Sequence, residues 1–464
     1  MSFIKKVYQS SPYQLKQGAK WVYTLLPIHL RYKRDFFKMS AWLEQSQWWS
    51  LEKLEEYQNE RLRVLIQHVY NNVPYYHRLF RRLGLSPSDI KTIQDLPKIP
   101  ILTKEVLRNQ SRDLLANNFD EKALVYLSTS GTTGQPVGIY SEKRLEYSDG
   151  DPFWRRHYQW GGCSLTDRIA KLTASTIQPK INGTRRLFSY NPVRNLLILS
   201  AYDLNRKNIG QYAIALDKYQ PEFINGFPSA LETMVRYFKD NSISKPVHLK
   251  AIFTQSEMLY PWQRNLIENY FGCEIYDWYG MEERVVCASE CEKHAGHHLF
   301  SEFSIVEFIK DGKPVVGEEG EIIATRLDNY AMPLIRYCTR DIGVQLQKKC
   351  DCGRNLPLMK IVGGRDRNFA VTKTGGLISV TIIDVPKSGN IEQFQFVQEE
   401  KGVMTLRIVK KEIFSEDDLK LINKNLFEKF GDMMAVRIEF VDKISLTARG
   451  KLPLLIQRLN IDEN

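Results

Sequence analysis

The spacing of apolar and polar positions predicts helices and short strands in the first 160 residues. Between residues 41 and 116 apolar side chains recur at helical intervals, so we expect this stretch to be largely helical. A helix capped by Thr103 is expected within it. Short strands are expected at Ala123–Leu127 and Val137–Tyr140, separated by a loop rich in Ser, Thr and Gly. A further helix is expected over Glu142–Trp160.

From Arg206 to Glu283 the pattern alternates between helices and strands. Helices are expected at Asn208–Tyr219, Pro228–Asp240 and Pro261–Tyr270, and strands at Glu222–Asn225, Leu249–Thr254 and Glu274–Trp278. This alternation predicts an α/β fold, in which helices cover a parallel sheet. Ligands bind beyond the carboxyl ends of such strands. The turns there are Gly226–Ser229, Thr254–Glu257 and Tyr279–Glu283, and we expect them to form one composite pocket.

The last third of the chain changes character. Ser304–Gln347 is expected to be rich in hairpins, and Gly363–Arg367 interrupts the apolar pattern. Beyond it strands are expected at Gln393–Gln398, Val403–Lys410 and Ala435–Val441, with a helix at Ser415–Phe430. We therefore expect an arm at residues 1–40, a large domain at 41–363 and a small α+β domain at 364–464, behind a glycine hinge.

The composition is that of a globular protein. The chain has 464 residues, of which 43% are hydrophobic and 26% charged. It contains no run of about 18 apolar residues, so no membrane span is expected. It also lacks a convincing signal peptide. Seven cysteines is an odd number for a disulfide framework, so we expect a reduced, cytoplasmic chain.

The net charge of +11 is unevenly distributed. In the first forty residues only Asp35 is acidic, and the basic residues alternate with aromatic and aliphatic ones. The basic residues are Lys5, Lys6, Lys16, Lys20, Arg31, Lys33, Arg34 and Lys38. No nucleic-acid motif follows, so we expect no nucleic-acid partner. Two interpretations stay open. The arm packs on its own domain, or it rests peripherally on the anionic inner face of the membrane.

The loop between the first two expected strands has the composition of a phosphate cradle. Its glycines allow tight backbone turns, so several N–H groups can converge on one anion while hydroxyl groups add donors. A Walker A loop is excluded, because its lysine is missing and a strand follows instead of a helix. The residues concerned are Ser128, Thr129, Ser130, Gly131, Thr132, Thr133 and Gly134.

This loop resembles the nucleotide-binding loop of adenylate-forming enzymes, the acyl-CoA synthetase superfamily. The resemblance implies an acyl-CoA synthetase-like fold: a large N-terminal domain and a small α+β C-terminal lid. It also implies that the loop binds ATP, with Thr132 acting in catalysis. Many members carry a lysine after the loop's proline, whereas this chain has Val137. Pro100–Lys104 is similar to a stretch that precedes the loop in the family.

Other motifs of the same family follow in order. Tyr279–Glu283 resembles Tyr-Gly-x-Thr-Glu, with Glu282 in place of threonine. The resemblance implies that Tyr279 stacks on adenine and that Glu283 holds Mg²⁺ against the phosphates, which suits a hard cation. The other residues expected to bind the nucleotide here are Gly280, Met281, Ser256 and Glu257.

Three further segments complete the nucleotide motifs. Asp341 matches the aspartate that accepts hydrogen bonds from the ribose hydroxyls, although Arg340 replaces the usual glycine. Arg365 matches the start of the hinge motif, but Arg367 stands where that motif has an aspartate. By resemblance, Lys451 is the catalytic lysine that stabilises charge during adenylation.

Cysteine and histidine spacing predicts a metal centre. Two thiolates one residue apart, Cys350 and Cys352, can form a closed tetrahedral Zn²⁺ site with Cys and His from a second segment. Resemblance to relatives with similar stretches selects Cys291 and His298 as the other ligands, with Cys287 and His297 as rivals. Such a closed site is structural. The alternative is a set of free buried cysteines.

The motifs cover about residues 90 to 460 and resemble the phenylacetate–CoA ligase branch. Within it, Gly226–Leu231 and Ile391–Gln395 resemble CapK-like proteins of capsule and polysaccharide gene clusters. The resemblance implies that ATP activates a small carboxylate as an acyl-adenylate. The acyl group then passes to CoA or to an amine or hydroxyl, for example of a sugar. Transfer of AMP itself stays open as a third route. The rival hypothesis is a non-catalytic scaffold for glycan assembly at the membrane, favoured by departures such as Val137 and Arg340.

Overall fold

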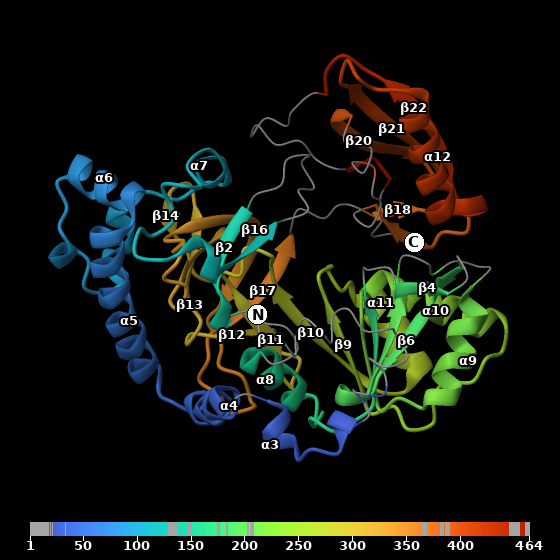
Figure 1. Ribbon diagram of the computed structural model, residues 1–464, viewed down its shortest axis with the longest axis horizontal. Coiled ribbons are helices and arrows are strands. Elements are labelled where there is room, and N and C mark those ends of the chain that lie inside the picture. The colour runs from blue at the N-terminus through green and yellow to red at the C-terminus, as the bar shows by residue number, and fades with distance from the viewer. Residues whose placement is uncertain are drawn as a thin grey trace. The chain divides into compact units, whose positions relative to one another are not determined.

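The computed structural model divides the chain into two compact units (Figure 1). Unit 1 comprises residues 1–43 and 149–277, and unit 2 comprises residues 44–148 and 278–464. The residues that the structure describes are 18, 20, 22–32, 34–128, 138–145, 151–173, 177–181, 184–201, 204, 208–363, 369–380, 385, 390–444 and 455–459. Each unit is described by itself.

Unit 1 contains the predicted parallel sheet. Its strands lie in the order β9, β8, β3, β7, β6, and only β6 is antiparallel to its neighbour. Their bounds are β3 (Ile169–Thr173), β6 (Phe188–Asn191), β7 (Leu196–Ser200), β8 (Phe223–Gly226) and β9 (Ala251–Gln255). A separate hairpin joins β4 (Ile177–Ile181) and β5 (Thr184–Arg186). The chain leaves unit 1 within β10 (Glu274–Gly280).

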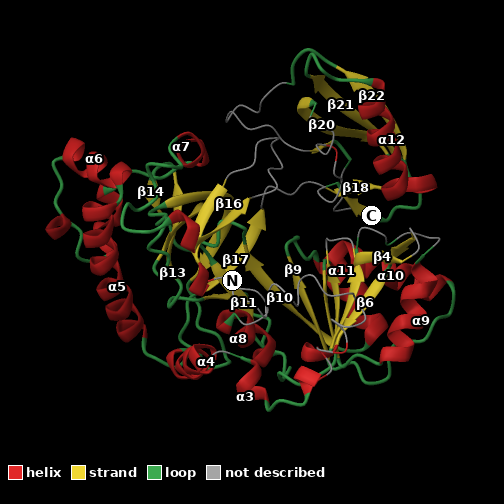
Figure 2. Ribbon diagram, viewed as in Figure 1, coloured by secondary structure: helices red, strands yellow, loops and turns green. Residues whose placement is uncertain are grey.

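Each face of this sheet has its own apolar core. Leu172, Ile224 and Ile252 pack with residues of α9 (Ile209–Tyr219), α10 (Pro228–Asp240) and α11 (Pro261–Phe271). On the opposite face Phe223 and Phe253 pack with Tyr158 of α8 (Pro152–Trp160). The three helices and three strands predicted between residues 208 and 280 are therefore confirmed (Figure 2).

The helix predicted over Glu142–Trp160 is wrong in its first half. Glu142 ends strand β2 (Gly138–Glu142), a 3-10 turn covers Lys143–Leu145, and α8 begins only at Pro152. Proline suits the first helical position because its missing N–H would have no partner there. Asp151 caps the helix, since its carboxylate accepts from the Phe153 N–H at 2.8 Å.

Unit 2 begins with helices where helical spacing predicts them. These are α5 (Leu51–Asn72), α6 (Pro74–Leu83) and α7 (Lys104–Asn109), preceded by α4 (Arg34–Ser46), which starts in unit 1. Five apolar side chains of α5 are buried, as its spacing predicts: Leu54, Leu62, Leu65, Ile66 and Val69. The predicted Thr103 cap is confirmed, because its hydroxyl accepts from the Val106 N–H at 3.3 Å.

The sheet of unit 2 is antiparallel, as the predicted hairpins require. Its strands lie in the order β14, β13, β15, β16, β17, β12, β11, β10. Their bounds are β11 (Cys287–Glu290), β12 (His297–Leu299), β13 (Ser304–Lys310), β14 (Lys313–Pro314), β15 (Glu319–Arg326), β16 (Tyr337–Leu346) and β17 (Leu358–Gly363). Beside it, β1 (Leu124–Ser128) pairs antiparallel with β2, which confirms the strands expected on each side of the loop.

The C-terminal segment has a core of its own. Strands β20 (Ile391–Glu400), β21 (Val403–Lys410), β22 (Ala435–Phe440) and β23 (Leu455–Gln457) form one sheet, and α12 (Glu416–Phe430) packs on it. A hairpin of β18 (Phe369–Val371) and β19 (Leu377–Ser379) contributes to the same core. The α+β elements predicted here are confirmed, whereas the domain boundaries at residues 40 and 363 stay predictions.

Candidate functional site

Part of the predicted nucleotide site lies outside the described residues. This holds for the loop from Thr129 to Pro136, which includes Thr132, and for Arg365 and Lys451. The strands that flank the loop are described, and Ser128 at the end of β1 pairs in register with Gly138. The loop therefore connects two neighbouring antiparallel strands.

Glu283 lies in the turn between β10 and β11 and is almost completely buried. Its Oε1 atom accepts hydrogen bonds from the Lys104 Nζ at 3.2 Å and from the Tyr337 hydroxyl at 3.1 Å. The Lys104 side chain is equally buried, with 3% of its surface exposed. Charges in such surroundings are tolerated when they are paired. The structure thus supplies Glu283 with its own counter-charge.

Lys104 reaches Glu283 because the preceding extended segment pairs with β16. The Leu102 N–H donates to the Arg336 carbonyl, and the Cys338 N–H donates to the Leu102 carbonyl, both at 2.9 Å. Helix α7 then begins at Lys104. The stretch singled out in the sequence as Pro100–Lys104 is therefore a strand-like segment that delivers one lysine to a buried carboxylate.

Arg336 fixes the start of β16. Its guanidinium donates to both oxygens of Glu307 at 2.9 Å and to the Ile99 carbonyl at 2.7 Å. Its backbone has φ of 51°, an uncommon conformation for a residue with a side chain. This bidentate pair holds Tyr337 and the strand that follows in place.

Two residues predicted separately to bind the nucleotide are brought together. The Tyr279 hydroxyl, at the end of β10, donates to Oδ2 of Asp341 in β16 at 2.7 Å. The Asp341 N–H donates to the Thr339 hydroxyl oxygen at 3.0 Å, which helps to orient the segment. Between Tyr279 and Glu283, position 280 has no room for a side chain, which explains the glycine there. A Cβ there would lie 2.7 Å from Nε1 of Trp278. Met281 packs against the main core of unit 2.

Arg340, which replaces the glycine of the family motif, is accommodated by its surroundings. It has φ of 67°, a conformation that glycine adopts without strain. Its guanidinium forms an ion pair with Glu105 of α7. Ser256 and Glu257 follow β9 and belong to unit 1, and Ser256 also has a positive φ, of 68°.

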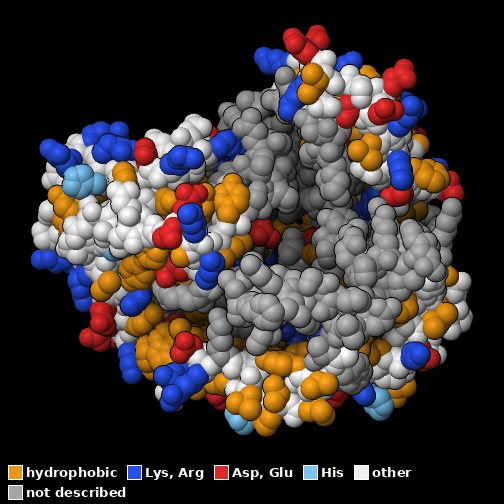
Figure 3. Space-filling model, in the orientation of Figure 1, with side chains coloured by type: hydrophobic (Ala, Val, Ile, Leu, Met, Phe, Trp, Pro, Cys, Tyr) orange, Lys and Arg blue, Asp and Glu red, His pale blue; other side chains and the backbone are white. Residues whose placement is uncertain are grey.

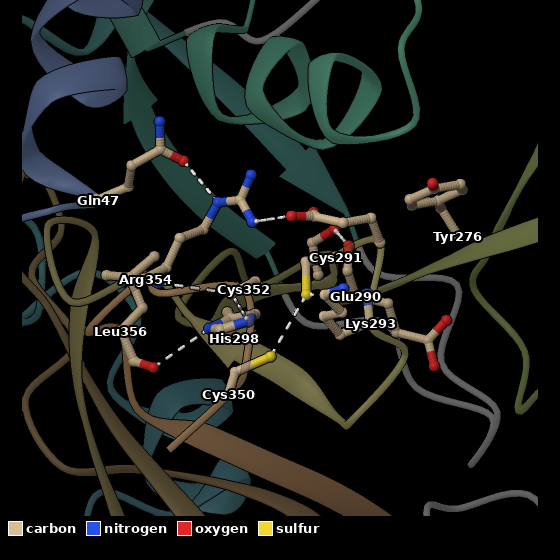
Figure 4. Close-up of polar contacts among 12 residues, drawn as sticks. Gln47, Tyr276, Glu290, Cys291, Lys293, His298, Cys350, Cys352, Arg354 and Leu356 are labelled. Carbon is tan, nitrogen blue, oxygen red and sulfur yellow. Dashed lines mark hydrogen bonds and ion pairs between the residues drawn. The ribbon is translucent and has the colours of Figure 1, made fainter.

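The four predicted metal ligands converge. The donor atoms of Cys291, His298, Cys350 and Cys352 all lie within 4.8 Å of one another. The Sγ atoms of Cys291 and Cys350 are 3.6 Å apart, and Sγ of Cys352 lies 3.5 Å from Nε2 of His298 (Figure 4). The rivals Cys287 and His297 are not part of the group found among the described residues. Three thiols and one imidazole form a donor set suited to Zn²⁺.

The hydrogen bonds around the cluster orient its donors. Nδ1 of His298 lies 3.2 Å from the Leu356 carbonyl, so the ring donates there and Nε2 is left facing the sulfur atoms. The backbone N–H groups of Lys293 and Arg354 donate to the sulfur atoms of Cys291 at 3.4 Å and Cys352 at 3.5 Å. Such bonds favour thiolates, which are the form that binds a metal.

Burial is the first cause of the pKa shifts in the cluster. Burial lowers the pKa of His298 to about 4, so the ring is neutral near neutral pH and carries a lone pair. Burial raises the pKa of Cys291 and of Cys350. Burial also acts to raise the pKa of Cys352, but hydrogen bonds from Arg354 and from the neighbouring thiols outweigh it and lower that pKa.

Arg354 connects the cluster to the beginning of unit 2. Its guanidinium donates to Oε1 of Gln47 at 2.9 Å (Figure 4). It also donates to both carboxylate oxygens of Glu292 at 2.9 Å and lies over the ring of Trp48. Sequence reasoning assigned no role to Arg354. It also missed Lys104 and Tyr337 as partners of Glu283, although the Pro100–Lys104 spacing was a usable signal for Lys104.

Comparison with known proteins confirms the resemblance on which these motifs rest. Residues 370–458 match the family model of the CapK C-terminal domain. Protein CapK of Staphylococcus aureus is 24% identical over 419 residues, which cover 88% of this chain and 90% of the relative. The phenylacetate-coenzyme A ligase of Thermus thermophilus is 25% identical over 429 residues, with 85% of this chain and 90% of the relative covered.

Solved structures show the same fold. A 2-hydroxyisobutyryl-CoA ligase in complex with 2-HIB-AMP and CoA superposes with a TM-score of 0.61 at 17% identity, covering 90% of this chain and 94% of the other. An open conformation of that ligase gives a TM-score of 0.57 at 18% identity, with 93% and 95% covered. The chain therefore has the fold of the adenylate-forming CoA ligases, and over most of its length it is similar to CapK and to phenylacetate–coenzyme A ligases.

Proposed function

We propose that this protein activates a small carboxylic acid with ATP. The acid attacks the α-phosphate, forming an acyl-adenylate and releasing pyrophosphate, and a nucleophile then takes the acyl group and releases AMP. One observation carries the proposal: the Tyr279 hydroxyl and the Asp341 carboxylate are 2.7 Å apart. Two residues proposed to bind adenine and ribose thus meet at one point, although they are 62 positions apart in the chain.

We assign a task to each residue predicted to bind the nucleotide. Tyr279 offers a ring face to adenine, and Asp341 accepts hydrogen bonds from the ribose hydroxyls. The Ser/Thr/Gly loop holds the phosphates, and Lys451 stabilises the charge that develops as the acid attacks. In this assignment the domain after residue 363 supplies Lys451 and closes over the bound nucleotide.

Glu283 fits a role in using Mg·ATP. A carboxylate oxygen is the ligand type that Mg²⁺ prefers, and a bound ion would neutralise phosphate charge. Before ATP arrives, Lys104 and Tyr337 hold the carboxylate in place by pairing with it. The position of Glu283 then does not depend on the nucleotide.

The Cys–His cluster is proposed to hold a structural Zn²⁺. The ligands would be Cys291, His298, Cys350 and Cys352, and with four protein donors no position is left for a substrate. Such an ion would connect the segment at residues 287–299 with the one at residues 350–358. Its contribution is to stability and not to the reaction.

The acceptor of the acyl group is proposed to be CoA, or an amine or hydroxyl of a sugar. The names of two relatives favour CoA, because they are phenylacetate-coenzyme A ligases. The name CapK, together with the match of residues 370–458 to the CapK C-terminal domain, favours a role in capsular or exopolysaccharide biosynthesis. To distinguish these two kinds of acceptor, CoA or amino sugars are added to the purified enzyme with its acid, and the compound that receives the acyl group is identified.

The described part of the arm supports a peripheral place at the anionic inner face of the membrane, within the cytoplasm. Val22, Leu25 and Leu30 expose 67%, 82% and 56% of their surface, and Lys20, Arg34 and Lys38 lie near them in sequence. Figure 3 shows hydrophobic side chains gathered at its lower edge, where Figure 1 places α3 (Ile28–Arg31). Among the described helices, none is long and apolar enough to cross a membrane.

Flotation with anionic liposomes tests this placement. Each Lys or Arg near an anionic surface contributes about 1 kcal/mol, and the attraction is screened by salt. Full-length protein should float at low salt, whereas Leu25→Glu protein should float less. Ile413→Glu, at a similarly exposed position in the C-terminal segment, is the control. Full-length protein that never floats would contradict membrane contact.

The test of the proposed reaction is acid-dependent release of pyrophosphate from ATP. Wild-type protein should release it with at least one acid of a chemically broad panel, and Lys451→Ala should reduce the rate by roughly a thousandfold. ATP should still bind to Lys451→Ala protein. A wild-type rate in the Lys451→Ala protein would remove that lysine from the mechanism. ATP binding without turnover by any acid would favour the non-catalytic scaffold.

A further inference from the structure

The four-stranded sheet of the C-terminal segment ends at β22, which among the described strands has β21 as its one neighbour (Figure 1). Two hydrogen bonds at the ends of β22 show which peptide groups face β21. The Ala435 N–H donates to the Gly402 carbonyl at 2.8 Å, and the Val441 N–H donates to the Ile408 carbonyl at 2.9 Å. In a parallel pair, alternate residues turn their peptide groups to the same neighbour. Residues 435, 437, 439 and 441 therefore bond to β21.

The residues in between turn their N–H and C=O groups to the outer edge of the sheet. These residues are Val436, Ile438 and Phe440, and within the described ranges nothing bonds to those groups. Proteins protect such edges with bulges or proline, because a free edge is a template for another strand. β22 has neither, since its six residues pair with β21 in unbroken register. Its edge is therefore open to a further strand.

The two faces of β22 differ in character. Val436 and Ile438 pack against the core that α12 covers, whereas Arg437 and Glu439 lie on the opposite face and are exposed. Glu439 accepts from Nε of Arg407 on β21 at 2.9 Å through one oxygen, and half of its side chain stays exposed. No carboxylate among the described residues pairs with Arg437. The edge thus presents one cation and one anion, two residues apart on the same face.

This spacing makes the edge complementary to itself. When two β22 strands pair antiparallel about Ile438, Arg437 of each copy lies opposite Glu439 of the other, so two opposite-charge pairs form. Ile438 then bonds to Ile438 of the second copy through both peptide groups, and Phe440, which is 41% exposed, lies opposite Val436. Pairing about Arg437 or about Glu439 would place like charges opposite each other, which is destabilising. The charges therefore select one register.

We propose that the edge of β22 binds a second copy of this chain by antiparallel pairing of the two β22 strands about Ile438. The two four-stranded sheets become one continuous sheet. Residues opposite each other in an antiparallel pair share a face, so α12 of both copies covers the same side. Because one short strand carries the contact, the association is weak, with a Kd on the order of 10 µM.

Sedimentation equilibrium of the full chain over a concentration series tests the pairing through its charges. Arg437→Glu and Glu439→Arg should each weaken the dimer roughly tenfold or more, because each substitution places like charges opposite at two points. A mixture of the two variants should associate at least as tightly as wild-type protein, since a strand with two anions then meets a strand with two cations. A fluorescent label on one variant identifies the mixed dimer.

A second pair of variants tests the backbone bonds. Ile438→Pro removes an N–H that faces the outer edge and should abolish the dimer, whereas Ile438→Val keeps that N–H and should keep the dimer. Lys420→Glu reverses an exposed charge on α12, away from the edge, and should leave the dimer unchanged. Circular dichroism confirms that each variant is folded.

Three results would overturn the proposal. Wild-type protein that stays monomeric up to about 100 µM would leave the edge to a strand of another protein. A dimer that withstands Arg437→Glu or Ile438→Pro would use another surface. The two charge variants failing to associate when mixed would refute the register about Ile438.

Discussion

The Cys–His cluster and the corner formed by Glu283, Lys104 and Tyr337 both hold buried polar groups, but the charge is balanced in different ways. Both bring polar groups from distant segments into the buried interior of unit 2. At the corner, the Glu283 carboxylate meets a cation of the chain itself, the Lys104 ammonium at 3.2 Å. In the cluster, four donor atoms that all carry lone pairs lie within 4.8 Å of one another.

The two regions therefore differ in whether they need a bound ion. In the thiolate form that binds a metal, the three sulfur atoms would repel one another at such distances, so the proposed Zn²⁺ would balance their charge from outside the chain. The corner is complete without one, because its ion pair and the Tyr337 hydroxyl already satisfy Oε1 of Glu283. We therefore expect metal removal to destabilise the protein through the cluster and to leave the corner intact.

The largest effect is expected from removing cluster ligands. Purified protein should contain about one Zn²⁺ per chain, and Cys350→Ser with Cys352→Ser should lose it together with roughly 4 kcal/mol or more of the free energy of unfolding. Metal analysis and calorimetry measure both quantities. Cys273→Ser changes a cysteine outside the cluster and should keep the metal. Protein purified without chelator that contains no metal would refute the zinc assignment.

The next largest effect is expected from breaking the ion pair between Lys104 and Glu283. Lys104→Met leaves the Glu283 carboxylate buried without its cation and should cost about 3–5 kcal/mol of unfolding free energy. Combining it with Glu283→Gln removes both charges and should recover most of that loss. Urea unfolding of the two single variants and the double variant gives the coupling energy.

Lys98→Met provides the control for this pair. Lys98 is exposed and bonded to Asp95 at 2.7 Å, so its loss should cost no more than about 1 kcal/mol. If the losses of unfolding free energy caused by Lys104→Met and by Glu283→Gln simply add in the double variant, the two residues do not act as the buried pair described here.

A smaller effect is expected from the residue that orients the cluster. Arg354→Met removes the bonds to Glu292 and Gln47 and the guanidinium that lies near Cys352. The four ligands remain, so metal should still bind, but with an affinity about 10–100-fold lower. Competition with a chromogenic chelator measures the change. Unaltered affinity would mean that Arg354 serves packing alone.

The smallest effect is expected from Tyr279→Phe. This substitution removes the hydroxyl that donates to Asp341 but keeps the ring for stacking on adenine. Stability should fall by about 1 kcal/mol, and ATP affinity should change only a few-fold. Asp341→Ala should weaken ATP binding more, because the proposed ribose acceptor is lost. Weaker ATP binding by Tyr279→Phe than by Asp341→Ala would contradict the assigned roles.

The sequence predicted much of the fold because its signals are local. Helical spacing from Leu54 to Val69 and the alternation between residues 208 and 280 depend on neighbouring positions, and both were confirmed. The helix over Glu142–Trp160 was extended too far for the same reason. Its early residues have helical spacing, but the helix begins only at Pro152, where Asp151 provides the cap.

The site was less predictable where its contacts are long-range. The metal ligands were found because Cys350 and Cys352 form a recognisable local pair and family resemblance supplied the rest. No local signal connects Lys104 with Glu283, which are 179 positions apart. Their contact depends on the pairing of Leu102 with β16, and that pairing follows from the packing of the whole unit.

The most direct test of the central claim locates the bound nucleotide. Full-length protein is irradiated with 8-azido-ATP, and the labelled peptides are identified by mass spectrometry. The label should lie in the segment at residues 274–286 or in β16, and unmodified ATP should prevent it, because Tyr279 and Asp341 form the proposed adenosine site. A label that ATP prevents but that maps only to other segments would contradict this account, as would labelling that ATP does not affect.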